Sequence, residues 1–466
     1  MVGEDLLYKP VTEIARLLRD RKLSPVELTR ACLTRTESLD PRLHAWVTVA
    51  SEQALLEARQ AEKEITAGRY RGPLHGVPYG AKDLLATRGV RTTWGAQPLE
   101  SQMIDDDAAV IRRLRQAGAV LLGKLAMIEL AGGLGYSKGN ASLTGAARNP
   151  WDQGRWTCGS SSGSGAAVSA AMVPFAIGSE TWGSIICPSS FCGISGLRPT
   201  FGRVSRQGAM ALSWTLDKIG PMARSARDCE IVLRAIAGKD AADPYSAEEP
   251  QGPEANPESA RRFKVAYVQL DFDKSGNPGV REAFHRALVD LAHAGAVAER
   301  VELPKLPFEA TTIAVLTSEA ATAFEELEKS GAVRRLATTD AALSFVTARA
   351  VRGSDLVKAQ RIRTLCQRAM AELFTTYDVL LCPGEMHTAF PVDKDFSEIE
   401  WEDPVGAAGN LCGLPAVTVP CGFDADGLPV GLAMMSGAFE ESRALSLARL
   451  YQTITAWHEH RPPIQV

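Results

Sequence analysis

The stretch Gly159-Ser160-Ser161-Ser162-Gly163-Ser164-Gly165, which continues directly into Ala166-Ala167-Val168, is the most distinctive part of this sequence. It lies in a wider segment, residues 118–208, that holds 17 glycines and 13 serines in 91 residues. Glycine permits close backbone approach and unusual dihedral angles, but each one costs conformational entropy, so a dense cluster needs a reason. A Gly/Ser linker would lack the apolar residues that follow, which predict the start of a helix. The segment is therefore expected to be folded and to carry a site.

The glycine spacing does not match a phosphate-binding loop. No Gly-Lys-Ser or Gly-Lys-Thr occurs, and Lys138 stands where the dinucleotide fingerprint needs its third glycine. The run does contain Gly-x-Ser-x-Gly, the turn that carries the nucleophile of α/β-hydrolases, with Ser161 at its centre and His387 or His458 as a later base. That turn needs a buried strand before it, whereas residues 152–158 are largely polar. This reading remains a minor alternative.

Length and composition describe an ordinary folded chain. The 466 residues are 45% apolar and 23% charged, enough for a sizeable core. A net charge of −4 gives no basic surface, so no nucleic-acid partner is expected. The N-terminus carries acids where a signal peptide needs a basic start, and no run of about 18 apolar residues occurs. We therefore expect a cytoplasmic protein that makes no contact with a membrane.

The cysteines and histidines follow no metal-binding pattern. Nine cysteines are scattered and never spaced Cys-x-x-Cys, which predicts reduced thiols rather than a zinc site or a disulfide framework. The seven histidines include no His-x-x-x-His pair. No metal and no other cofactor are therefore expected.

Helical and strand-like segments alternate along the chain, which predicts a sheet covered by helices. Ser24-Pro25-Val26-Glu27 has the pattern of a helix start, with a capping serine, proline at the first position and glutamate three residues on. The acidic, proline-rich segment 239–261 predicts a surface loop between two halves of one fold. Helices are expected within 11–38 (two of them) and at 51–67, 108–117, 166–171, 280–294 and 441–456, and strands at 79–82, 119–122, 175–177, 265–268, 379–382 and 414–422.

Five motifs occur in order around the serine run. They are Gly76-Val77-Pro78-Tyr79-Gly80-Ala81-Lys82-Asp83, Arg148-Asn149-Pro150-Trp151-Asp152, the run itself, Gly178-Ser179-Glu180-Thr181-Trp182-Gly183-Ser184-Ile185 and Phe191-Cys192-Gly193-Ile194-Ser195-Gly196-Leu197-Arg198-Pro199-Thr200. Continuous over about 72–228 and resuming over 414–431, this pattern resembles the amidase signature family of serine hydrolases.

The resemblance implies the fold and its boundaries. It predicts an α/β fold, with one large domain over 1–466 built on a central mixed β-sheet covered by helices on both faces. Within it we expect an N-terminal helical segment (1–70), the signature core (72–228), the surface loop (239–261) and a C-terminal half of the same sheet (262–466).

The resemblance also implies a Ser–cis-Ser–Lys triad, formed here by Ser184, Ser160 and Lys82. Serine is a poor nucleophile and needs a base, which a lysine can be only when its surroundings lower its pKa. Ser160 would accept the proton of Ser184 and pass a proton to neutral Lys82, and in the family the peptide bond before this relay serine is cis. We expect Gly159, Ser161 and Asp83 to support and orient the relay.

Backbone N–H groups just before the nucleophile form the family's oxyanion hole, here those of Thr181, Trp182, Gly183 and Ser184. Two departures from the family suggest the substrate. Trp182 stands where many members have glycine, and Cys187 stands where an arginine is frequent, which favours a neutral or aromatic substrate. Cys158, which replaces a glycine beside the relay serine, is expected to be a packed thiol. The residues expected to line the substrate site are Gly132, Gly133, Leu134, Trp182 and Cys187.

Three functions are compatible with these residues. The first is a stand-alone amidase that cleaves small neutral or aryl amides, with carbamates (as a urethanase) and esters also possible, through an acyl-enzyme. It would act as a monomer or homodimer, with a small-molecule amide or carbamate as its only partner. The second is the glutaminase component of a tRNA-dependent Asp/Glu amidotransferase (its A subunit), which releases ammonia from glutamine and passes it to a partner. The third is an inactive binding module, which the complete triad disfavours.

Overall fold

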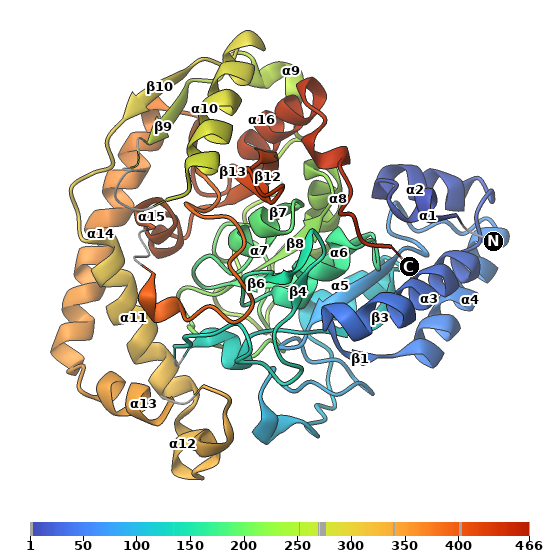
Figure 1. Cartoon of the computed structure of the whole chain (residues 1–466), viewed down its shortest axis with the longest axis horizontal. Helices are drawn as coiled ribbons and strands as arrows, with labels where there is room; N and C mark the ends of the chain where they lie inside the picture. Colours follow the sequence, from blue (N-terminus) through green and yellow to red (C-terminus); the bar gives the residue numbers. More distant parts are fainter. Residues whose placement is uncertain are drawn as a thin grey trace.

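The structure, a computed structural model, describes residues 3–133, 135–250, 252–268, 270, 276–338, 341–399 and 403–465. Eleven strands within these residues form one mixed sheet in the order β1-β3-β2-β6-β8-β7-β12-β13-β11-β9-β10 (Figure 1). The strands are β1 (Trp46–Val49), β2 (Pro78–Lys82), β3 (Val120–Leu125), β6 (Phe175–Glu180), β7 (Ser195–Arg198), β8 (Lys218–Ala223), β9 (Val265–Val268), β10 (Ala298–Val301), β11 (Val379–Pro383), β12 (Ala416–Phe423) and β13 (Pro429–Met435). The expected α/β fold with a central mixed sheet is confirmed.

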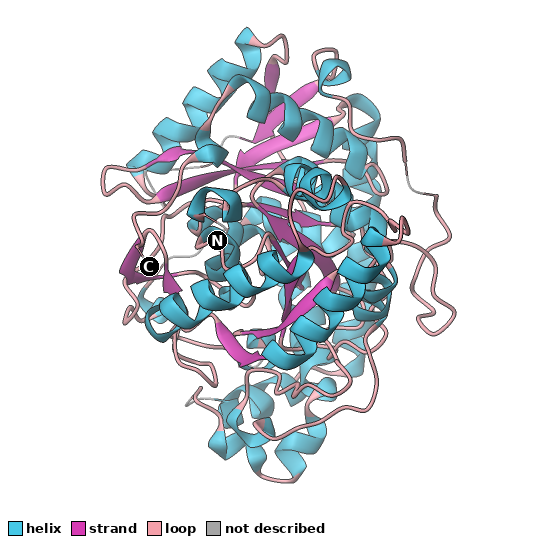
Figure 2. Cartoon of the chain, turned by 90° about the vertical axis from the view of Figure 1, so that its right-hand side faces the viewer, coloured by secondary structure: helices cyan, strands magenta, loops and turns pink. Residues whose placement is uncertain are grey.

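Helices cover both faces of this sheet, as the two views show (Figures 1 and 2). Two short strands, β4 (Arg148–Asn149) and β5 (Asp152–Trp156), pair separately. The helices are α1 (Glu4–Leu7), α2 (Val11–Arg19), α3 (Pro25–Leu43), α4 (Ser51–Thr66), α5 (Ala109–Gln116), α6 (Ser162–Ser169), α7 (Ile186–Phe191), α8 (Ala226–Ile236), α9 (Pro257–Ala260), α10 (Pro278–His293), α11 (Phe308–Ala323), α12 (Glu325–Lys329), α13 (Ala341–Arg349), α14 (Gly353–Thr376), α15 (Pro404–Cys412) and α16 (Glu441–Ile454).

Local sequence chemistry explains several of these boundaries. Ser24 caps α3 by accepting hydrogen bonds from the backbone of Val26 and Glu27, and the Glu27 side chain accepts one from the backbone of Ser24. This capping box is the one that the sequence predicts. The segment 239–261 is mostly loop, as expected, but α9 interrupts it because Asn256 caps a helical turn that begins with Pro257.

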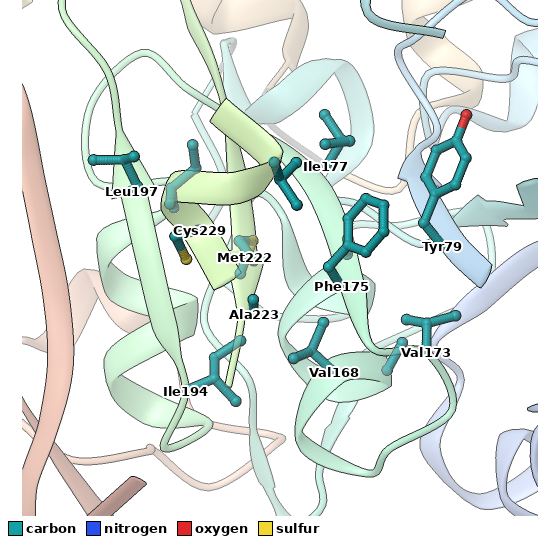
Figure 3. Packing of buried hydrophobic residues seen from close by; sticks show 14 of the residues in the cluster. Tyr79, Val168, Val173, Phe175, Ile177, Ile194, Leu197, Met222, Ala223 and Cys229 are labelled. Carbon is teal, nitrogen blue, oxygen red and sulfur yellow. The ribbon is translucent and has the colours of Figure 1, made fainter. Parts of the chain in front are cut away.

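The core around β6 is tightly packed (Figure 3). Phe175 of β6 stacks on Tyr79 of β2 with ring centroids 5.3 Å apart and planes only 5° from parallel. Ile177 and Met222 are buried in the same cluster, from the neighbouring strands β6 and β8. This packing holds the strands that carry the site in fixed register.

Strands β2 and β6 determine where the site lies. They are parallel neighbours, with Ala81 opposite Ile177, so their carboxyl ends meet at one edge of the sheet. Lys82 is the last residue of β2 and Glu180 the last residue of β6. Helix α6, which starts within the serine run, packs against both strands.

Candidate active site

Lys82 is completely buried among hydroxyl groups. Its Nζ lies 2.7 Å from Ser160 Oγ, 2.9 Å from Ser161 Oγ, and 3.0 Å and 3.2 Å from the Oγ and carbonyl oxygen of Ser179. Burial lowers the pKa of Lys82 from its usual 10.5 to about 7. A lysine with this pKa is about half deprotonated at pH 7, so its amine can accept a proton from a neighbouring hydroxyl.

The serine run places two hydroxyls against this amine. The peptide bond between Gly159 and Ser160 is cis, as the resemblance implies. Ser161 Oγ donates to the carbonyl oxygen of Ser179 at 3.1 Å and accepts from its N–H at 3.3 Å, which ties the run to β6. A Cβ on Gly159 would lie 2.7 Å from Cγ1 of Ile128, so this position has little room for a side chain.

The proposed nucleophile, Ser184, follows β6 in a tight turn. Gly183 has a φ of +78°, a conformation that glycine adopts readily. The carbonyl oxygen of Gly183 accepts a hydrogen bond from Cys187 N at 2.8 Å. Ser184 is 7% exposed, and no hydrogen bond joins its hydroxyl to that of Ser160 in this structure. Catalytic hydrogen bonds often form only when substrate is present.

Glu180 fixes the backbone just after Ser184 through hydrogen bonds to its carboxylate. Its Oε2 accepts hydrogen bonds from the backbone N–H groups of Ile185 (2.8 Å) and Ile186 (3.0 Å). Its Oε1 accepts from Arg198 Nη1 (2.8 Å) and Asn410 Nδ2 (3.0 Å). Burial alone would raise the pKa of Glu180, but Arg198 outweighs it and lowers the pKa to about 2. Glu180 is therefore a permanent negative charge that fixes the start of α7.

Asp83 does not contact the relay. Its Oδ2 accepts the backbone N–H of Thr93 at 3.0 Å and also the Thr93 hydroxyl, and Lys124 Nζ lies 3.5 Å from its Oδ1. Lys124 donates in turn to the carbonyl oxygen of Leu85 at 2.6 Å. Asp83 therefore stabilises the backbone that follows Lys82 and does not orient the hydroxyls of Ser160 and Ser161.

Two of the nine cysteines form a disulfide, which corrects the expectation that all of them are reduced thiols. Cys158 and Cys187 are bonded, with Cα atoms 6.0 Å apart, and both are almost completely buried. The bond links the residue two before Ser160 to the residue three after Ser184. The two cysteines are 29 residues apart in sequence, so only the fold reveals that they meet. Cys187 is therefore not a free thiol in the substrate site.

The other residues expected around the substrate have different environments. Trp182 Nε1 donates to Asp403 Oδ2 at 2.8 Å. A Cβ on Gly132 would meet the ring of Tyr136, and one on Gly133 would meet Leu212. Leu134 lies outside the described residues.

For several polar residues of the site, the sequence alone predicts no role. Ser179 lies within one of the five motifs without an expected role, yet it contacts Lys82 through both its hydroxyl and its carbonyl oxygen. Asp217 accepts a hydrogen bond from the Thr181 hydroxyl at 2.6 Å. Glu385 and Asp403 line a narrow cavity together with Gly183. Only the parallel pairing of β2 with β6 could have indicated Ser179 in advance, since the others come from distant segments.

A buried lysine with a lowered pKa against two serines, at the carboxyl edge of a mixed sheet, can act as a base toward a serine hydroxyl. The family model described as Amidase matches residues 27–445. This chain belongs to the amidase family and is an enzyme that acts on carbon–nitrogen bonds.

Solved structures and curated relatives agree with this assignment. The native peptide amidase from Stenotrophomonas maltophilia is 32% identical, with a TM-score of 0.86 over 98% of both chains. The A subunit of the glutamyl-tRNA(Gln) amidotransferase from Thermotoga maritima is 30% identical, with a TM-score of 0.80 over 97% of this chain and 95% of that one. The corresponding protein of Moorella thermoacetica is 36% identical over 99% of this chain and its whole length.

These relatives correct two expectations. Curated proteins 34–36% identical over nearly the full length are A subunits of glutamyl-tRNA(Gln) amidotransferases, which overturns the stand-alone hydrolase of small neutral or aryl amides and carbamates. They also overturn the expectation of a monomer or homodimer without a nucleic-acid partner. The presence of Cys187 in place of an arginine did not predict the substrate correctly, because Cys187 forms a disulfide with Cys158 and is not a free side chain of the substrate site.

No helix in the parts of the chain that the structure describes is long and apolar enough to span a membrane.

Proposed function

We propose that this chain is the glutamine-hydrolysing component of a glutamyl-tRNA(Gln) amidotransferase. The proposal is supported by the full-length similarity to the A subunits of such enzymes and by the geometry around Lys82. It makes the other subunits and a tRNA the partners of this chain, and it implies a cytoplasmic location. Ammonia released at the site would be used by a partner polypeptide.

In the proposed reaction the Ser184 hydroxyl attacks the side-chain amide carbon of glutamine. Its proton passes to Ser160 Oγ while the Ser160 proton passes to neutral Lys82, 2.7 Å away. The carbonyl oxygen becomes an oxyanion that the N–H groups of Thr181 to Ser184 stabilise. The same proton path runs back to the departing nitrogen, which leaves as ammonia. Water then attacks the acyl-enzyme, giving glutamate and free Ser184.

The observation that carries the choice of glutamine is an acidic cavity beside the nucleophile. The cavity measures about 30 Å³ and is lined by Gly183, by the carboxyl groups of Glu385 and Asp403, and by the Glu180–Arg198 ion pair, in which the charge of Arg198 is already matched. Burial raises the pKa of Asp403 to about 6, and burial and the charge of Asp403 raise that of Glu385. Such a small cavity has room for a group the size of one or two waters. The ammonium of glutamine has this size, and its positive charge would pair with the carboxyl groups of Glu385 and Asp403.

The proposal is tested by following the amide nitrogen. The chain, assembled with the other amidotransferase subunits of the same genome, is given glutamine labelled with ¹⁵N in its side-chain amide and glutamyl-tRNA(Gln). We expect the label to appear in glutaminyl-tRNA(Gln), and to be lost with a Ser184→Ala chain. Hydrolysis of peptide C-terminal amides by the chain alone, with no label reaching tRNA in the assembly, would contradict the proposal.

Removing either carboxyl group of the acidic cavity should weaken glutamine binding more than it slows the chemistry. In Glu385→Gln and Asp403→Asn chains we expect KM for glutamine to rise roughly 10- to 100-fold, the effect of losing a charged hydrogen bond, with kcat changed by much less. N-acetylglutamine, which has no ammonium, is the matched substrate and should respond little. Equal losses on both substrates would show that the cavity does not bind the ammonium.

A further inference from the structure

Asp217 joins the oxyanion segment to a loop that is distant in sequence. Its Oδ1 accepts a hydrogen bond from the Thr181 hydroxyl at 2.6 Å. Its Oδ2 accepts from the backbone N–H groups of Leu212 (2.8 Å) and Ser213 (3.0 Å). Thr181 is the first residue after β6 and the first of the proposed oxyanion donors. One carboxylate therefore links the place where charge develops to the Leu212–Ser213 turn.

Side chains of two helices, α11 and α14, bind the outer side of this turn without involving Asp217. Glu319 of α11 accepts hydrogen bonds from Thr215 N (3.1 Å) and Thr215 Oγ1 (2.8 Å), and also from the Ser213 hydroxyl. Arg363 of α14 donates to the Thr215 carbonyl oxygen at 2.7 Å. Residues of α11 and α14 thus fix the outer side of the turn. Asp217 connects the inner side of the turn to Thr181, so the position of the turn determines the position of Thr181.

Asp217 also lies within electrostatic reach of the catalytic base. Its negative charge favours the protonated form of Lys82, as does that of Glu180. Besides Lys82, the charges that face Asp217 are Arg206 from the preceding loop and Lys218 from β8. Burial raises the pKa of Asp217 above its usual value, and the hydrogen bonds from Thr181, Ser213 and Leu212 and the charge of Arg206 offset this only in part. Three donors on one carboxylate are typical of the ionised form.

We propose that Asp217 is a positioning residue for amide hydrolysis, which holds Thr181 at the oxyanion site and keeps a negative charge near Lys82. The inference rests on the proposed roles of Lys82 and Ser184, but it does not depend on which amide is the substrate. Removing the charge should therefore change both the plateau rate and the pH at which the base becomes active.

The test uses an alkyl fluorophosphonate, which reports on Ser184 without any natural substrate. Ser184 Oγ bonds to phosphorus, fluoride leaves, and the serine proton passes through Ser160 to Lys82. The rate of labelling, measured by intact mass from pH 5.5 to 9.5, should rise with the neutral fraction of Lys82. In Asp217→Asn we expect a plateau about 10- to 100-fold lower. We also expect a midpoint at lower pH, because protonated Lys82 loses a nearby negative charge.

Three matched variants separate position from charge. Thr181→Val removes the hydroxyl contact but keeps the carboxylate, so its plateau should fall while its midpoint stays at the wild-type pH. Asp217→Glu should keep the midpoint for the same reason, and Glu319→Gln should leave it in place because only the outer side of the turn is loosened. An Asp217→Asn curve that superimposes on that of Thr181→Val would overturn the proposal. If the labelling results hold but the assembly transfers no glutamine nitrogen, the proposed substrate fails and the role of Asp217 stands.

Discussion

Replacing Ser184 by alanine is expected to lower glutamine hydrolysis by the assembled enzyme roughly 10⁴- to 10⁶-fold, the range found when a catalytic serine is removed. The change deletes the atom that forms the acyl-enzyme, and it leaves Lys82, Ser160 and the oxyanion N–H groups in place. Ser184 is almost buried and no side-chain hydrogen bond of its hydroxyl is lost, so folding should be little affected. Initial rates of glutamate release and the melting temperature measure the two effects.

Ser162→Ala is the matched control, because Ser162 lies in the same run and its hydroxyl points to the carbonyl oxygen of Ala126 at 3.4 Å, away from Lys82. It should retain activity within a few-fold of wild type. Peptide mapping after fluorophosphonate treatment should find the label on Ser184. A label on Ser161, with activity surviving in Ser184→Ala, would instead support the Gly-x-Ser-x-Gly alternative.

Elements with strong local signals could be predicted from the sequence. The capping box at Ser24 and the strand at 175–177 both depend on residues within one or two turns. The helix expected at 166–171 is α6, but it starts at Ser162, inside the serine run, because the serines and glycines there give no apolar signal for its first turn. Strands β7 and β8 have no such signal, because they are short, contain glycine or proline and are buried on both faces. A strand buried on both faces has no alternation of polar and apolar residues to reveal it.

The site divides in the same way. Lys82, Ser160 and Ser184 are indicated by ordered motifs, each a contiguous string of residues. Asp217 and Asp403 could not be indicated by any local string, because strand pairing and the return of the chain at 403 bring them to the site. The disulfide is a similar case, since its two cysteines are 29 residues apart and the packing of the intervening α6 and β6 brings them together.

Lys82 should set the pH dependence of the reaction. Because burial lowers its pKa to about 7, kcat/KM for glutamine should rise about tenfold per pH unit below pH 7 and level off above it. Lys82→Met should lower kcat/KM about 10³- to 10⁴-fold and abolish this rise, since no base remains. Lys82→Arg keeps a cation that can donate hydrogen bonds but stays protonated at every accessible pH, and it should be equally inactive from pH 6 to 9. Activity in the arginine variant would show that Lys82 acts as a cation and not as a base.

The same lysine should leave a signature in stability. In the unfolded chain it holds its proton up to about pH 10.4, whereas in the folded enzyme it loses that proton near pH 7. Between these values the unfolded state binds more protons, so the contribution of Lys82 to the free energy of unfolding increases with pH. Denaturant unfolding at pH 6, 7, 8 and 9 should therefore show wild type gaining stability relative to Lys82→Met as the pH rises. A constant difference between the two proteins would mean that folded Lys82 keeps its proton across this range, and a protonated amine could not accept the proton that Ser184 must lose.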